Sequence, residues 1–201
     1  MSVVGTGKTF LSNEELNRLP SIMALNHAQG LSSSYKQYRT IEVIDTLREL
    51  NWFPSFAQEQ RTYDEEKAGY QKHLVRFRQV DNSPVAVGDT FPELILTNAH
   101  NGLSAYHINF GLFRLACLNG MVVSEASFAT LRLRHIGFTQ GNIIEATREI
   151  IKGMPQIMNK VGEFKALPMS EGEVLLFGKS ALIAKFGNEK SEVKEQLNDL
   201  T

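Results

Sequence analysis

The chain has 201 residues, of which 42% are hydrophobic and 21% are charged, and its formal net charge is -1. This composition excludes a wholly disordered chain and a continuous coiled coil, and no uncharged apolar run approaches the ~20 residues that span a bilayer. Because a dedicated duplex-DNA binder is usually strongly basic, the net charge argues mildly against nucleic acid unless cations cluster locally.

The first fifty residues predict helices. Ser12 and Glu15 form a capping-box pattern at the start of a short helix that stops at Pro20. Thr40 is expected to cap a second helix, which ends at Asn51 and carries the apolar residues Ile44, Leu47 and Leu50 at helical spacing.

The middle of the chain predicts β-strands. Alternating apolar and polar residues bounded by turn signals indicate strands at 52–63, 70–80, 93–100, 103–109 and 128–136. Asn101-Gly102 is the strongest short turn signal and predicts a hairpin between the third and fourth of these strands. Residues 111–119 fit either a helical turn or a strand.

The last third predicts helices. Apolar residues at a helical period run from Ile143 to Val161, and Pro155 is expected to kink or break that helix near Gly153. A second capping box begins at Ser170 and opens a helix that continues through Ala184.

Strands followed by helices predict an α+β fold, in which an antiparallel sheet with hairpins is packed by N-terminal and C-terminal helices. We expect one domain over residues 1–201, with a flexible N-terminus at 1–10 and a polar tail at 188–201. Gly5-Thr-Gly-Lys-Thr9 looks like the end of a phosphate-binding loop, but Ser2 stands where the full pattern needs glycine, which favours the flexible terminus.

The cysteine content and the N-terminal residues indicate the compartment. Cys117 is the single cysteine, which excludes an intrachain disulfide and a four-cysteine zinc site. The N-terminal residues contain Lys8 and no apolar signal-peptide core. We therefore expect a cytoplasmic protein of the host cell with no membrane segment.

Two predicted strands carry cations that alternate with apolar residues. Lys72, Arg76 and Arg78 share one side of the first strand, and Arg132 and Arg134 share one side of the last. If both strands lie in one sheet with their arginines on the same face, they form a basic ridge that can follow a phosphate backbone. The alternative is a solvated face whose arginines are bridged to nearby carboxylates.

The histidines and aromatic residues of the strand region are weaker candidates. No histidine spacing matches a known metal-ligand set, although His100 and His107 flank the hairpin and their rings could approach across it; the four histidines concerned are His73, His100, His107 and His135. The aromatic residues that precede the basic strands could stack bases, but this spacing is more often that of a core; they are Trp52, Phe53, Phe56, Tyr63 and Tyr70.

Several motifs between about Leu19 and Gly187 resemble, in order, those of the uncharacterised phage- and plasmid-like proteins typified by YfjQ and YafZ. The matching segments are Ser34–Lys36 with Thr40, Leu50–Pro54 with Ala57-Gln58, Lys72–Arg78, Leu96–Gly102, Ser104–Tyr106, Phe113–Val123 and Arg134–Gly137. The residues that fall on these motifs include His73, Arg76, Arg78, His100, Arg114, Cys117, Asn119 and His135, whereas His107 does not.

The resemblance implies a mobile-element setting but no reaction. Members often have aspartate where this chain has Asn101, and this departure counts against a base or hard-metal ligand there. A more remote similarity of layout, which includes the helical segment Gly178–Gly187, is to the Redβ/RecT/Rad52-like annealing proteins. It implies a β-hairpin-rich sheet, ring or filament oligomers and a basic groove for a single strand.

These patterns favour a non-catalytic protein that binds and anneals single-stranded DNA during phage recombination or replication, without a cofactor or a bound metal. The expected partners are single-stranded DNA, further copies of the chain in a ring or filament, and a phage exonuclease or host single-strand-binding protein. The expected phosphate contacts are Arg76, Arg78, Arg132 and Arg134, with Arg61, Lys72, Arg114, Lys179 and Lys185 as auxiliaries.

Two other functions stay open. The chain could be an anti-restriction or anti-defence protein that binds a host protein, since its acidic segments would suit a protein that occupies another protein's DNA site. It could also be a metal-dependent nuclease that uses His73, His100 or His135, although clustered carboxylates are scarce.

Overall fold

The computed structural model describes residues 2–5, 9–80, 90–115 and 122–186. The chain divides into two compact units, Met1–Pro155 and Gln156–Thr201. Within the described residues, no helix has the length and apolar content needed to cross a membrane.

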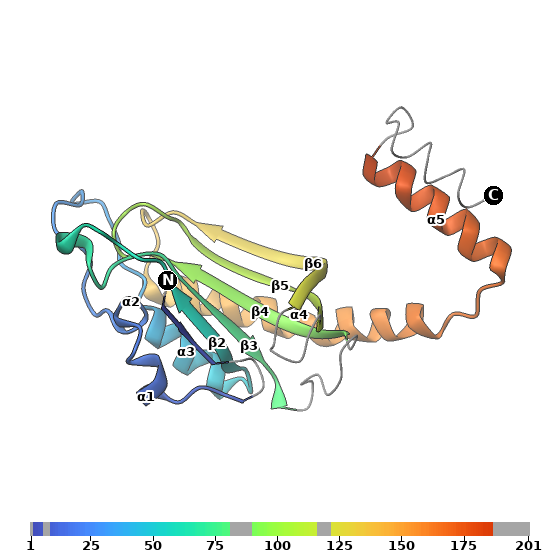
Figure 1. The fold of residues 1–201 in the computed structure, drawn as a ribbon, viewed down its shortest axis with the longest axis horizontal. Helices are drawn as coiled ribbons and strands as arrows, with labels where there is room; N and C mark the ends of the chain where they lie inside the picture. Colours follow the sequence, from blue (N-terminus) through green and yellow to red (C-terminus); the bar gives the residue numbers. More distant parts are fainter. Residues whose placement is uncertain (1, 6–8, 81–89, 116–121, 187–201) are drawn as a thin grey trace. The chain divides into compact units, whose positions relative to one another are not determined.

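The first unit is built on a six-stranded antiparallel sheet in which each strand pairs with its neighbours in sequence, in the order β1-β2-β3-β4-β5-β6 (Figure 1). The strands are β1 (Ser2–Val4), β2 (Phe53–Glu59), β3 (His73–Arg78), β4 (Thr90–Asn98), β5 (Tyr106–Leu115) and β6 (Val122–Leu133). A 3-10 turn, η1 (Glu65–Lys67), lies in the connection between β2 and β3.

Helices of this unit lie along one face of the sheet (Figure 1). They are α1 (Asn13–Leu16), α2 (Pro20–Met23), α3 (Thr40–Glu49) and the first part of α4 (Gln140–Ala166). The core between sheet and helices is fully buried, and its members include Leu16, Ile22, Ile44, Leu47, Val75, Phe77, Leu94, Leu96, Ile108, Phe110 and Ile143. Burial of this much apolar surface is the main favourable term in the stability of the unit.

The α+β fold with an antiparallel sheet and flanking helices is confirmed. The capping box at Ser12 is also confirmed, because the Ser12 hydroxyl accepts from the Glu15 amide at 3.3 Å while the Glu15 carboxylate accepts from the Ser12 amide at 2.8 Å. In the second unit, α5 (Glu171–Phe186) opens on the same reciprocal pair between Ser170 and Glu173.

The predicted cap of the second helix is wrong. Arg39, not Thr40, is the N-cap of α3, because Thr40 is the first residue inside the helix, and its hydroxyl is engaged by side chains of the sheet. The predicted hairpin around Asn101-Gly102 is confirmed, since β4 and β5 pair antiparallel, but its connection is longer than two residues, because β4 ends at Asn98 and β5 begins at Tyr106. Asn101 instead closes a local turn, its side-chain oxygen accepting from the Leu103 amide at 3.1 Å.

Of the expected kink or break near Gly153, the break does not occur, because α4 continues through Pro155. A proline inside a helix removes one backbone hydrogen bond and costs about 3 kcal/mol, but it does not prevent helical dihedrals on either side. On its N-terminal side Ile143 and Thr147 are fully buried, and this packing holds the helix against the sheet.

The N-terminal residues pair with the sheet where a flexible terminus is expected. Ser2–Val4 forms β1 against β2, with Val4 opposite Ala57. Gly5 follows at φ +80°, and a Cβ at this position would lie 2.7 Å from the Ser55 carbonyl oxygen. Gly5 therefore serves close approach of the backbone to β2; residues 6–8 of the phosphate-loop-like segment and the tail 188–201 lie outside the described residues.

Replacing Gly5 with alanine should destabilise the protein more than the same change at Gly30. Both glycines have φ near +80° (+80° and +76°), so both variants carry the left-handed penalty of about 1 kcal/mol, but the site at Gly30 has nothing within 4 Å. We expect Gly5→Ala to cost about 1–2 kcal/mol more than Gly30→Ala in urea unfolding, and equal losses would contradict the close contact with Ser55.

Candidate nucleic-acid interface

Strand alternation divides the side chains of the sheet between two faces. The core face carries Val75 and Phe77 on β3 and contacts the helices. The opposite face, which we call the outer face, includes Leu74 and Arg76 on β3. In register with Leu74 it carries Thr97, His107 and Arg132, in a row across four strands.

The predicted arginines of β3 and β6 therefore share a face, but β4 and β5 separate the two strands. With strands about 4.8 Å apart, the arginines of β3 and β6 are separated by roughly 14 Å of sheet. The outer face is best described in two parts, one around Arg76 and Arg78 and the other around Lys72 and Arg132.

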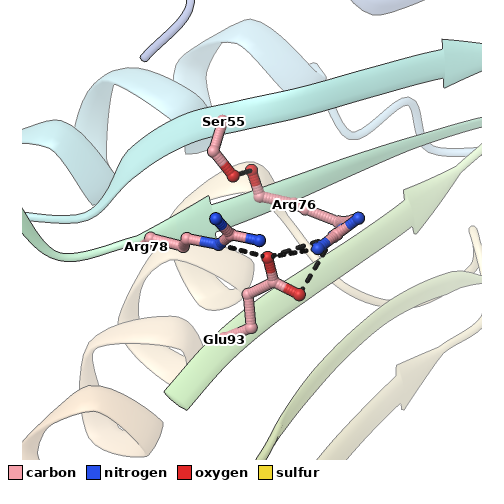
Figure 2. Close-up of polar contacts among 4 residues, drawn as sticks. All are labelled: Ser55, Arg76, Arg78 and Glu93. Carbon is pink, nitrogen blue, oxygen red and sulfur yellow. Dashed lines mark hydrogen bonds and ion pairs between the residues drawn. The ribbon is translucent and has the colours of Figure 1, made fainter. Parts of the chain in front are cut away.

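Arg76 and Arg78 converge on one carboxylate (Figure 2). The Arg76 guanidinium binds Glu93 through two nitrogens, with Nε at 2.9 Å from Oε2 and Nη2 at 2.8 Å from Oε1. The Arg78 Nε lies 2.7 Å from Oε1 of the same residue. Glu93 stands on β4, two residues before Ile95, which is the direct partner of Arg76 in the sheet register.

This ion-pair cluster is buried. The side chains of Glu93, Arg78 and Arg76 are 0%, 1% and 9% exposed, respectively. Aromatic rings line it, since the Arg78 guanidinium lies 4.3 Å from the centre of the Phe91 ring and that of Arg76 lies 5.3 Å from the centre of the Phe56 ring. Burial lowers the pKa of Arg78, and the Glu93 carboxylate opposes that effect.

The expected exposure of Arg76 and Arg78 to a phosphate backbone is therefore wrong. Their guanidinium groups are held by an internal carboxylate, so a phosphate would have to displace Glu93 and leave its charge buried, which costs several kcal/mol. The alternative of arginines bridged to carboxylates describes this pair better, except that the bridge is buried instead of solvated.

The other part of the outer face presents exposed cations. Lys72 and Arg132 are both exposed, and within the described part of the chain neither forms an ion pair. His107 lies between them, and its pKa is lowered first by burial and then by the positive charges of Arg132 and Lys72. A pocket of about 170 Å³ beside Lys72 is lined by polar groups that include Gln58, Gln60 and Thr97.

The remaining predicted contacts lie in different places. Arg61 is exposed just beyond β2, and Arg134 is exposed one residue beyond β6. Arg114 lies on β5 opposite Val123, but its side chain is outside the described part of the structure, as are Cys117 and Asn119. Lys179 and Lys185 belong to α5 in the second unit, so they are not placed on the sheet.

Three polar residues form a chain of hydrogen bonds that fixes His73 on the core face. The Asn98 amide donates to the Thr40 hydroxyl at 3.1 Å, and Thr40 Oγ1 lies 2.7 Å from His73 Nε2. His73 Nδ1 lies 3.1 Å from the Gln71 carbonyl oxygen, which can only accept. His73 is therefore protonated on Nδ1 and accepts on Nε2, and burial lowers its pKa to about 4.

Two further histidines are buried nearby. The ring of His100 lies 5.2 Å from that of His73, and burial together with neighbouring histidines lowers the pKa of His100 to about 3. His135 is stacked between Tyr35 and Tyr38, at 4.8 and 4.6 Å, and its Nδ1 donates to the Lys36 carbonyl oxygen at 2.9 Å. His107 faces the outer side, so it does not meet His100 across the turn.

These histidines gather as the nuclease hypothesis requires, but their geometry differs from a metal centre. Among the residues that the structure describes, no group of three histidine, cysteine or acidic side chains is arranged to hold a metal ion. The ring nitrogens of His73 are used in hydrogen bonds to protein groups, which indicates a structural role for that residue.

The sequence of the chain matches a known family. Residues 29–201 match the family model described as a domain of unknown function, DUF932. The chain belongs to the DUF932 family. It is also 31% identical, over 186 residues, to the UPF0380 proteins YafZ and YfjQ of Escherichia coli strain K12, an alignment that covers 92% of this chain and 67% of each relative. No solved structure matches this DUF932 chain.

Family membership confirms the resemblance seen in the motifs, and several of those motifs meet in space. Ser34–Lys36, Leu96–Gly102 and Arg134–Gly137 come together at the end of the sheet where Tyr35 stacks on His135. The Glu93 carboxylate was not among the predicted site residues. Its one sequence signal is a charged residue followed by an apolar run in a predicted strand.

Removing the Glu93 charge should destabilise the protein strongly. Glu93→Gln leaves two buried guanidinium groups without their shared carboxylate, a change that costs about 3–5 kcal/mol. Glu14→Gln, a matched change at an exposed position on α1, should cost less than about 0.5 kcal/mol. Urea unfolding of both variants measures the difference, and a Glu93 variant as stable as wild type would contradict the buried pairing.

Mild acid should destabilise the protein through its buried histidines. In the folded chain His73 and His100 have pKa values of about 4 and about 3, whereas an unfolded histidine titrates near 6.5. The unfolded state therefore binds protons first, so stability is complete above pH ~6.5 and falls as the pH drops toward 4, by about 1.4 kcal/mol per pH unit for each histidine.

The contribution of His100 can be isolated by substitution. Urea unfolding of wild type and His100→Leu at pH 7, 6 and 5 should show a slope of stability against pH that is shallower by about one proton in the variant. Identical slopes would show that His100 is not held neutral in the folded protein.

Proposed function

We propose that this protein binds single-stranded nucleic acid on the outer face of its sheet and promotes annealing without catalysing a reaction. The observation that carries the proposal is the pair of exposed cations, Lys72 and Arg132, which have no ion-pair partner among the described residues and flank His107. When exposed cations of this kind bind phosphates, they displace the counterions condensed on the nucleic acid. The release of these counterions supplies affinity that does not depend on sequence.

The row of side chains between the cations suits a flexible single strand. Thr97 and His107 follow Leu74 across β4 and β5 and end at Arg132, so hydrogen-bonding groups lie between the positive charges. Because β3 and β6 are about 14 Å apart across the sheet, Lys72, just before β3, and Arg132 on β6 would contact different phosphates of one strand. Annealing needs no cofactor, since charge neutralisation and exposed base edges suffice.

The proposal includes a setting and an assembly. We place the protein in the cytoplasm of a cell that hosts a phage or other mobile element, where it would act in recombination or replication beside an exonuclease or a host single-strand-binding protein. The proposed assembly is a ring or filament of the kind formed by Redβ/RecT/Rad52-like proteins.

Neutralising the two cations should weaken binding to a labelled oligothymidine and reduce its salt dependence. The double variant Lys72→Gln/Arg132→Gln loses two phosphate contacts, so the slope of log affinity against log salt should fall by about 1.4, with at least about a ten-fold loss near 0.15 M salt. Fluorescence anisotropy at several salt concentrations measures both quantities.

The matched control removes two exposed positive charges from the helical side of the first unit. Arg18→Gln/Lys152→Gln changes the net charge equally, and both positions are exposed. This control should bind as wild type does. A wild-type protein that fails to bind the oligonucleotide at low salt, or equal losses in the two double variants, would rule out the proposed interface.

A further inference from the structure

A second pocket lies at the end of the sheet next to the buried histidines. It has a volume of about 260 Å³, and its lining includes Tyr35, Leu103, Ser104, Arg134, His135 and Ile136. The Tyr35 side chain in this pocket is held in place, because its ring stacks on His135 and its hydroxyl donates to the Ala99 carbonyl oxygen at 3.2 Å. Lys36 and His135 are also joined through their backbones, by a hydrogen bond of 2.7 Å.

The lining combines apolar, aromatic and cationic groups. Leu103 and Ile136 are 77% and 55% exposed, so two large apolar side chains at this pocket are accessible to a ligand. Arg134 is exposed and, in the described part of the chain, has no ion-pair partner. None of the lining residues is acidic. A planar, weakly polar ring with an attached anion would complement these surfaces.

The position of the pocket connects it to the proposed interface. Arg134 follows Arg132 by two residues, and two residues of extended chain span at most about 7 Å. A strand that contacts Lys72 and Arg132 on the outer face would therefore reach the pocket within one or two nucleotides. The volume is slightly below that of pockets for drug-sized ligands, which limits the occupant to a small group such as one base.

We infer that this pocket receives one base of the bound single strand, with Leu103, Ile136 and Tyr35 contacting the base and Arg134 contacting its phosphate. The inference rests on the proposed function, because it assigns a base site to the same strand that the outer face holds. Such a site makes binding depend on the bases, whereas the contacts at Lys72 and Arg132 depend on phosphates alone.

Two 15-nucleotide probes separate these contributions, oligothymidine and an abasic strand with the same number of phosphates. Wild type should prefer oligothymidine by at least about five-fold, since contact with a base contributes about 1–3 kcal/mol. Leu103→Ala/Ile136→Ala should reduce the preference to less than about three-fold with an unchanged salt slope. The control Leu25→Ala, at a leucine that is 59% exposed outside the pocket lining, should keep it.

A second measurement does not depend on the stability of the variants. Wild type irradiated with an oligonucleotide that contains 4-thiothymidine should form crosslinks within Tyr35, Gly102–Ala105 or Arg134–Ile136, located by mass spectrometry of the peptides. Crosslinks confined to other segments would overturn the pocket assignment.

The outcomes distinguish the two proposals. Equal binding of both probes by wild type, or a full base preference in the pocket variant, overturns the pocket while the phosphate interface stands. Failure of wild type to bind either probe overturns both proposals together.

Discussion

The shared carboxylate of Glu93 is the interaction on which the outer face depends. A charged group without exposure is tolerated only when opposite charges and hydrogen bonds replace its water, and here two arginines from the neighbouring strand supply both. The pairing also reinforces the register of β3 against β4, because a slip by one residue would send Arg76 to the core face. The positive charges of Arg76 and Arg78 are paired with Glu93. Among the described residues, the part of the outer face around Lys72 and Arg132 is therefore the one that can attract an anionic partner.

The core-face polar chain has a comparable effect on the other side of the sheet. Thr40 begins α3, and its hydroxyl links Asn98 of β4 to His73 of β3, so the helix is oriented by directional bonds as well as by apolar contact. Thr40 does not cap its own helix because it is the first residue inside α3, and its hydroxyl is directed toward Asn98 and His73 of the sheet. His100 lies beside His73 of this chain, and His135 is stacked between Tyr35 and Tyr38.

Much of the fold could be predicted from the sequence, because the capping boxes, the strand alternation and the apolar helical period are local signals that tertiary contacts did not override. The failures share one cause. The length of the turn at Asn101, the cap at Arg39 and the pairing of Arg76 with Glu93 all depend on which segments meet across the sheet, and this information is not local. Alternation could place Arg76 and Arg132 on one side of their strands. It could not show that Arg76 would be buried in an ion pair with Glu93, seventeen residues further along the chain.

The near-neutral net charge is compatible with an anionic partner because the charges are unevenly placed. The acidic run Asp64–Glu66 lies in the turn between β2 and β3, and Lys67 pairs with Asp64 there. Arg132 and Arg134 lie at the far side of the sheet, where His107 experiences the positive charges of both Arg132 and Lys72. At physiological salt, interactions between exposed charges fade over about 8 Å, so a bound strand would respond to these local groups and hardly to the total charge. The distribution favours a path from Lys72 across the outer face to Arg134, next to the pocket that Tyr35 and His135 line.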